Sequence, residues 1–118
     1  MKLSQHARNT KKLCGYRAKD IHKWIDSHFD KIRFQVVMAT GNMDYYNPFS
    51  HRQYKHNREA LAEAIEKFKH KYPPEIIECV FLQHLRDDYQ GYIPCKADFD
   101  DPEFIAKYHP WNIPKDEW

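Results

Sequence analysis

Three segments of this sequence carry histidine and carboxylate side chains at spacings that suit metal binding. They read HKWID at His22–Asp26, HRQYKH at His51–His56 and QHLRDD at Gln83–Asp88. In the first and the third, a histidine precedes an aspartate by four residues, so on a helix both side chains project from one face about one turn apart. Imidazole and carboxylate groups from facing helices commonly form transition-metal sites.

The three segments supply enough ligands for one or two divalent ions such as Zn, Mn, Fe or Ni. The candidate ligands are His22, Asp26, His51, His56, His84 and Asp88. A partly open metal site lowers the pKa of a bound water and makes it a nucleophile at neutral pH. Metal-assisted hydrolysis of a phosphoester is therefore one predicted activity, in which Arg52 and Arg58 would bind the phosphate oxygens.

Helical geometry leaves the role of these residues open. His51 and His56 are about 140° apart on an ideal helix, so they share one ion only if His51 lies in an irregular first turn. Otherwise His56 pairs with Glu59 three residues later. A histidine and an aspartate four residues apart also stabilise a helix by about 0.2–0.5 kcal/mol without any metal. A hydrogen-bonded network, a metal site and another kind of ligand site are all compatible with the pattern.

Hydrophobic spacing and capping signals predict four helices that would position these residues. We expect a short helix over Ser4–Leu13, one from Ala18 to a point between Ile32 and Gly41, one from Pro48 or Ser50 to Tyr72, and one from Pro73 to Tyr89. Residues 33–40 fit either a helix or a strand, because a brief apolar run does not distinguish them. The remaining histidines, His6 among them, are expected at the surface or at helix junctions.

The end of the chain differs from the rest in composition. Prolines at positions 94, 102, 110 and 114 alternate with aromatic residues. This pattern predicts an ordered wrap with one short helix over Pro102–Tyr108, capped by Asp101. The expected fold is mainly α: a single domain, 1–118, with a helical bundle of about four helices over roughly 16–92 and an extended tail over 93–118.

Composition favours a globular protein that does not enter membranes. The chain has 118 residues, of which 42% are apolar and 31% charged, and no apolar stretch approaches transmembrane length. Cys14, Cys79 and Cys95 are odd in number and widely spaced. They are expected to be reduced thiols in a cytoplasmic protein, because a secreted disulfide framework normally uses an even set.

The three segments, taken in order, resemble the motif series of a family of small bacterial and phage proteins of unknown function. The residues that carry the resemblance are HxWxD at 22–26, HRxxxH at 51–56 and QHxxxDxxGxIPxxxDF at 83–99. This chain departs from the family in a longer segment between Phe29 and His51 and in the tail after Phe99. The resemblance implies a mainly helical fold in which the motifs act as a unit, and it implies no particular chemistry.

Three classes of function remain. The first is a binding or adaptor protein of a phage or mobile element, which uses the aromatic tail or the basic amino end to bind a protein partner. The second is the metal-binding protein with hydrolase activity described above. The third is a nucleic-acid binder, suggested by nine Lys/Arg against three Asp/Glu in residues 1–33. We place the adaptor before the metal-binding hydrolase, because small proteins without an unmistakable catalytic motif are seldom identifiable as enzymes. The nucleic-acid binder is less favoured, because the basic charges are not interleaved with aromatics as in single-strand binders.

Overall fold

The computed structural model of this chain describes residues 2–27, 31–42, 45 and 55–108. Its helices are α1 (Leu3–Cys14), α2 (Lys19–Ile25), α3 (Lys31–Thr40), α5 (Leu61–Phe68), α6 (Pro74–Asp88) and α7 (Pro102–Lys107), with 3-10 helices η1 (Arg58–Ala60) and η2 (Lys96–Asp100). No strand occurs within these ranges, so the prediction of a mainly α fold is confirmed. Residues 33–40, which the sequence left open, are helical.

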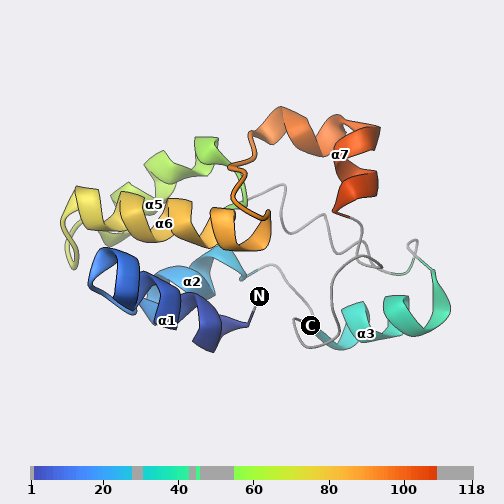
Figure 1. Cartoon of the computed structure of the whole chain (residues 1–118), viewed down its shortest axis with the longest axis horizontal. Coiled ribbons are helices and arrows are strands. Elements are labelled where there is room, and N and C mark those ends of the chain that lie inside the picture. The colour runs from blue at the N-terminus through green and yellow to red at the C-terminus, as the bar shows by residue number, and fades with distance from the viewer. Residues whose placement is uncertain (1, 28–30, 43–44, 46–54, 109–118) are drawn as a thin grey trace.

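Helix α6 is the element on which the others pack. Helices α1, α2 and α5 all contact it, and α3 lies apart from this group (Figure 1). The shared apolar core includes Ile21, Ile25, Ala64, Phe68, Ile77, Val80, Phe81 and Leu85. These residues recur at three- and four-residue steps in α2, α5 and α6, which gives each helix one buried stripe. The predicted bundle of about four helices is therefore confirmed.

Helix α1 buries a face that is mostly polar. It ends at Cys14 and is followed by Gly15, whose φ of 85° lies in the left-handed region that favours glycine. Its buried residues are His6, Ala7 and Thr10, which form one stripe toward α2 and α6. His6, which was expected at the surface or at a helix junction, lies at the junction of α1 with α2 and α6, and its side chain is fully buried.

Helix α2 is shorter than the hydrophobic stripe suggested. It ends at Ile25, and Asp26 occupies the C-cap position. Ile32, which was expected to extend the buried stripe, lies in α3 and is 76% exposed. The short α2 places Asp26 at the end of a helix, where its carboxylate can turn toward neighbouring segments.

The helix expected from Pro48 or Ser50 to Tyr72 is interrupted: Lys55 is helical, residues 56–57 are not, and the helix ends at Phe68 instead of Tyr72. Helix α5 starts at Leu61, after the 3-10 turn η1, and the side chain of Asn57 caps that turn by accepting a hydrogen bond from the backbone N–H of Ala60 (3.0 Å). His56 therefore precedes the helix and does not lie on its face. The alternative start signals, together with His51 and Arg52, lie outside the described residues.

The described carboxyl-terminal residues, 93–108, contain two short helical segments, η2 and α7. Helix α7 agrees with the predicted short helix, and the Asp101 side chain caps it by accepting from the N–H of Glu103 (2.9 Å). Together η2 and α7 place an aromatic cluster against the end of α6. Its members are Tyr89, Phe99, Phe104 and Tyr108. Phe99, Phe104 and Tyr108, which lie between the prolines, therefore pack on one another and on Tyr89.

A disulfide joins Cys14, at the end of α1, to Cys79 in α6. The expectation of three reduced thiols is therefore wrong for this pair, and Cys95 alone is free. The two cysteines are 65 residues apart in sequence, and only the packing of α1 on α6 brings them together. The expected cytoplasmic location loses the support that reduced thiols gave it. Among the described helices, none has the length and apolar character needed to cross a bilayer.

We expect the disulfide to stabilise the bundle, because it restricts the unfolded chain. Replacing both Cys14 and Cys79 by serine should lower the free energy of unfolding by about 2–4 kcal/mol. Denaturant unfolding without reductant would measure the loss, with Cys95→Ser as the control that should change little. Thiol titration of the unfolded, unreduced protein should find one thiol per chain, and a count of three would contradict the bond.

Candidate metal centre

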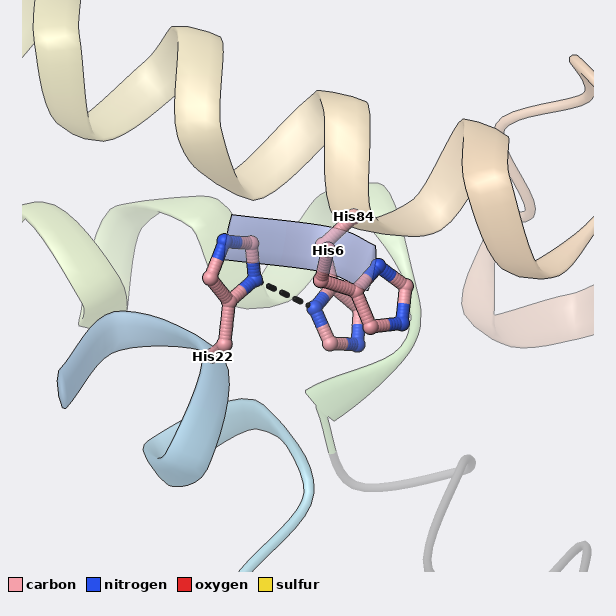
Figure 2. Close-up of side chains that lie close together, drawn as sticks. All are labelled: His6, His22 and His84. Carbon is pink, nitrogen blue, oxygen red and sulfur yellow. Dashed lines mark hydrogen bonds between the residues drawn. The ribbon is translucent and has the colours of Figure 1, made fainter. Parts of the chain in front are cut away.

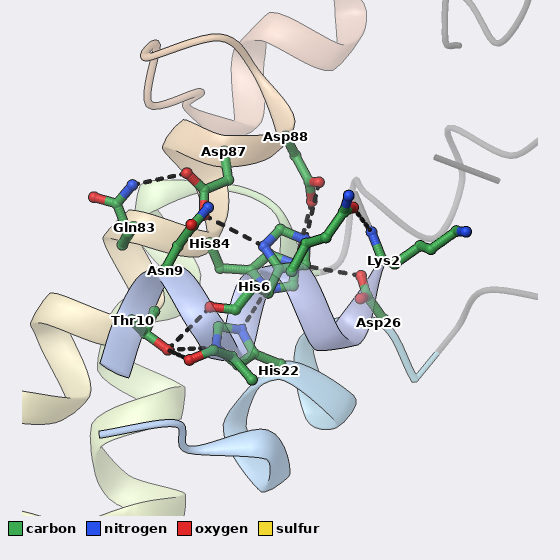
Figure 3. A network of polar contacts seen from close by, with 12 residues as sticks. Lys2, His6, Asn9, Thr10, His22, Asp26, Gln83, His84, Asp87 and Asp88 are labelled. Carbon is green, nitrogen blue, oxygen red and sulfur yellow. Dashed lines mark hydrogen bonds and ion pairs between the residues drawn. The ribbon is translucent and has the colours of Figure 1, made fainter. Parts of the chain in front are cut away.

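Four side chains from three segments converge at one end of the bundle. They are Asp26 at the end of α2, His56 before η1, and His84 and Asp88 one turn apart on α6. Figure 3 shows Asp26, His84 and Asp88. The Nε2 atom of His56 lies 3.0 Å from Asp26 Oδ1 and 3.2 Å from Asp88 Oδ2. The Nε2 atom of His84 lies 3.4 Å and 3.2 Å from the same two oxygens. The two Nε2 atoms are 3.3 Å apart.

Hydrogen bonds alone do not account for this geometry. A ring nitrogen carries at most one proton, yet each Nε2 atom lies within 3.4 Å of two carboxylate oxygens and of the other Nε2 atom. In a tetrahedral site with bonds of about 2.0–2.1 Å, neighbouring ligand atoms are about 3.3–3.4 Å apart. The five separations, 3.0–3.4 Å, are close to those edges. One cation between the four atoms would satisfy all of them.

Most of the cluster is removed from water. The side chains of His56, His84 and Asp88 are at most 4% exposed, whereas that of Asp26 is 34% exposed. The cluster therefore has one solvent-facing edge, at Asp26. A buried carboxylate needs a compensating positive charge, because its transfer from water is costly.

The electrostatics favour the charged forms of Asp26, Asp88 and His84. Burial would raise the pKa of the Asp88 carboxyl, but His6 and His84 hold it well below its usual range. Burial opposes ionisation of Asp26 too, and His84 and His56 lower its pKa. For His84, burial acts to lower the pKa, yet Asp26 and Asp88 together raise it to about 9. The two anions therefore attract a cation to this position, either a proton on His84 or a metal ion.

His22 lies behind His84, away from the two carboxylates. Its Nδ1 atom is 2.7 Å from His84 Nδ1 (Figure 2). Its Nε2 atom is 3.0 Å from Thr10 Oγ1 (Figure 3). Burial, and then the proximity of His84 and His6, lower the pKa of His22 to about 3. His22 is therefore neutral near pH 7, and it contacts a candidate ligand through that ligand's second nitrogen.

His6 packs on the face of the His84 ring. Its ring stacks on His84 with 3.8 Å between centroids, and its Nε2 atom lies 3.2 Å from Asp88 Oδ1. Its Nδ1 atom lies 3.6 Å from Asp87, whose carboxylate accepts hydrogen bonds from Asn9 and Gln83. His6 thus contacts the oxygen of Asp88 that faces away from the four-atom cluster.

His6, His22 and His84 form a second group whose nitrogens lie within 4.8 Å of one another. Two features make this group a poorer metal site. The rings of His6 and His84 are nearly parallel, with 12° between their planes, so their in-plane lone pairs do not converge. The 2.7 Å separation between the Nδ1 atoms of His22 and His84 is a hydrogen-bond length, shorter than the edge of a tetrahedral site.

The structure brings together four of the six predicted ligands. Asp26, His56, His84 and Asp88 form the cluster, His22 lies behind it, and His51 is outside the described residues. The predicted pairing of a histidine with an aspartate four residues later holds for His84 and Asp88, at 3.2 Å. Across α2, His22 turns toward Thr10 and His84, while Asp26 contacts His56 and His84.

The predicted ligand-binding residues near α5 have other roles. The guanidinium of Arg58 donates to the carbonyl of Ile93 (2.8 Å), and its backbone N–H donates to Pro94 (2.8 Å). The Glu59 carboxylate accepts from the backbone N–H of Lys96 (2.5 Å) and does not pair with His56 in the structure. Arg58 and Glu59 therefore attach the carboxyl-terminal part, and Arg52 lies outside the described residues.

Sequence reasoning missed His6 and Thr10. The signal was present, because His6, Ala7 and Thr10 are spaced so that they share one face of α1.

Comparisons of this chain with protein-family models, with curated proteins and with solved structures found no match. The chemistry of the site is therefore argued from its geometry.

The opposite pKa shifts of His22 and His84 predict a stability maximum near pH 6.5 for the metal-free protein. Below that pH the unfolded chain protonates His22 while the folded protein does not, because the folded pKa is about 3. Unfolding then takes up protons, and stability falls as pH falls. Above pH 6.5 the folded protein retains the proton on His84 until about pH 9, so stability falls as pH rises. The lowered pKa values of Asp26 and Asp88 add to the loss at acid pH.

Denaturant unfolding of chelator-treated protein across this range measures the effect. We expect slopes approaching about 1 kcal/mol per pH unit on each side of the maximum. A bound divalent ion would replace the proton on His84, so the decline above pH 6.5 should disappear when metal is restored. Stability that rises steadily from pH 6.5 to 9 in the metal-free protein would contradict the assignment.

Proposed function

We propose that this protein binds one divalent transition-metal ion through Asp26, His56, His84 and Asp88. The observation that carries the proposal is the set of five separations of 3.0–3.4 Å among four ligand atoms, which matches the edges of a tetrahedral site. Two further features support it. The ligands are largely buried, and each of the two histidines faces the carboxylates through its Nε2 atom.

The ligand set favours a divalent ion. Two carboxylates carry two negative charges, which one divalent ion neutralises while both histidines stay neutral. Imidazole and carboxylate suit Zn, Mn, Fe and Ni, and the tetrahedral spacing favours Zn²⁺ within that group.

The ion would connect parts of the chain that are distant in sequence. Asp26 ends α2, His84 and Asp88 lie on α6, and His56 begins the segment that leads to α5. That same segment binds residues 93–96 through Arg58 and Glu59. Metal binding should therefore stabilise both the bundle and the attachment of the carboxyl-terminal helices, because a ligand that binds only the folded state raises its stability.

Elemental analysis of the purified protein tests the proposal. The wild type, reconstituted with Zn²⁺ and freed of excess, should retain about one ion per chain, as one four-ligand site requires. His56→Ala and Asp88→Asn should each lose most of it, because each removes a ligand. His70→Ala is the matched control: His70 is exposed, lies away from the cluster and should leave the metal content unchanged.

The variants must be folded for this comparison to count, which circular dichroism checks. A folded wild type that stays free of Zn, Mn, Fe and Ni after reconstitution would overturn the proposal. Equal metal content in wild type, His56→Ala and Asp88→Asn would place the ion elsewhere. The adaptor and nucleic-acid interpretations remain predictions from the sequence.

Metal-dependent hydrolysis is a second candidate, favoured by the exposure of Asp26. Its side chain is 34% exposed, so water can reach the ion from that edge and become a fifth ligand. Two arginines were expected to bind a phosphate group. One of them, Arg58, instead donates a hydrogen bond to the Ile93 carbonyl.

Activity against a generic phosphodiester and a generic carboxylic ester tests this second candidate. The Zn²⁺-loaded wild type should turn over one of them, and His84→Ala should be inactive. His70→Ala should match the wild type. No turnover by fully loaded protein would leave the ion with a structural role.

A further inference from the structure

A chain of three polar side chains leads away from the cluster, and the proposed function uses only its last member, His84. Thr10 of α1, His22 of α2 and His84 of α6 are all fully buried and follow one another at hydrogen-bond distances (Figures 2 and 3). We propose that Thr10 and His22 are positioning residues, which fix the proton on Nδ1 of His84 and so leave its Nε2 atom to bind the metal. This inference rests on the proposed function.

The hydroxyl of Thr10 determines the first proton in the chain. Its oxygen lies 3.1 Å from the carbonyl oxygens of His6 and Arg17, and 3.3 Å from that of Ala7. Carbonyl oxygens only accept, so the single hydroxyl proton points to one of them. The lone pairs of Thr10 Oγ1 then face His22, and the contact of 3.0 Å requires that His22 Nε2 donate.

The second proton follows from the first. A neutral imidazole with its proton on Nε2 has an unprotonated Nδ1 atom, which can only accept. The Nδ1 atoms of His22 and His84 are 2.7 Å apart, so one proton must lie between them. That proton belongs to His84. The lone pair of a neutral His84 is thereby confined to Nε2, which is the atom that faces Asp26 and Asp88.

The consequence is a preorganised ligand. A metal-binding histidine generally donates its other N–H to a partner that fixes the ring and the tautomer, and loss of such a partner typically reduces metal affinity by 10–100-fold. Here the partner is a second histidine, which is itself fixed by a threonine on another helix. Helix α1 supplies no ligand to the four-atom cluster, yet it would set the affinity of the site.

Substitution of Thr10 tests this role. Thr10→Val preserves the shape of the side chain and removes the acceptor for His22, so His22 can adopt the other tautomer and place a proton between itself and His84. We expect Zn²⁺ affinity, measured by competition with a chelator, to fall by roughly tenfold or more. Thr10→Ser, which restores the hydroxyl, should bind within a few-fold of the wild type.

Thr40→Val is the matched control for the loss of a hydroxyl. Thr40 also donates to a carbonyl of its own helix, Val36 at 2.8 Å, but it is exposed and lies on α3. It should bind Zn²⁺ as the wild type does. Unfolding of each metal-free variant separates a general loss of stability from a loss of affinity.

Proton-detected ¹⁵N NMR of the histidine rings gives a readout that needs no variant. In wild-type protein, with and without Zn²⁺, His22 should show a protonated Nε2 and a bare Nδ1 atom, and His84 should keep its Nδ1 proton when Zn²⁺ is bound. A proton on Nδ1 of His22 would overturn the inference. So would wild-type affinity in Thr10→Val.

The failure of this inference differs from the failure of the proposed function. If wild type binds Zn²⁺ and Thr10→Val binds it equally well, the metal site stands and the positioning role falls. If wild type binds no metal, both the proposed function and the positioning role fall.

Discussion

Two carboxylates that face the same buried histidine impose the central constraint on this structure. Asp26 and Asp88 both lie within 3.4 Å of His84 Nε2, and Asp88 has almost no access to water. Their charge must be balanced inside the protein, since burial of an unpaired carboxylate is costly. Every segment of the bundle contributes to that balance: α2 supplies Asp26, the segment before α5 supplies His56, α6 supplies His84 and Asp88, and α1 supplies His6, which contacts Asp88.

This constraint explains why α1 belongs to the fold although it offers little apolar surface. Its buried face carries His6 and Thr10, whose partners are groups on α2 and α6. The disulfide joins the far end of α1 to α6. The helix is thus held at one end by a covalent bond and near the other by polar contacts. Hydrophobic burial, which holds α2 and α5 on α6, has a minor part here.

The parts of the fold that sequence predicted are those set by local signals. Gly15 ends α1, Pro74 begins α6 and Asp101 caps α7, because each acts on its own few residues. The errors all depend on packing between segments. The capping signals before His51 gave no indication of the break at Asn57, which lets His56 turn to the cluster. The disulfide needed two helices side by side. Likewise, His22 and His84 each precede an aspartate by four residues. Asp26 lies just beyond the end of α2, whereas Asp88 is the last residue of α6, and only His84 and Asp88 meet.

The hydrogen-bonded network and the proposed metal site, which the sequence left as alternatives, would be two states of one cluster. In the metal-free state His84 carries a proton, because its pKa is about 9, and the two carboxylates are ionised. One positive charge then faces two negative charges at these three groups. A divalent ion would displace that proton and leave two neutral histidine ligands, so its charge would equal that of the carboxylates. Net charge in a buried site is costly, and the metal-bound state would be the neutral one. The same two aspartates that hold a proton on His84 would therefore favour its exchange for a divalent ion.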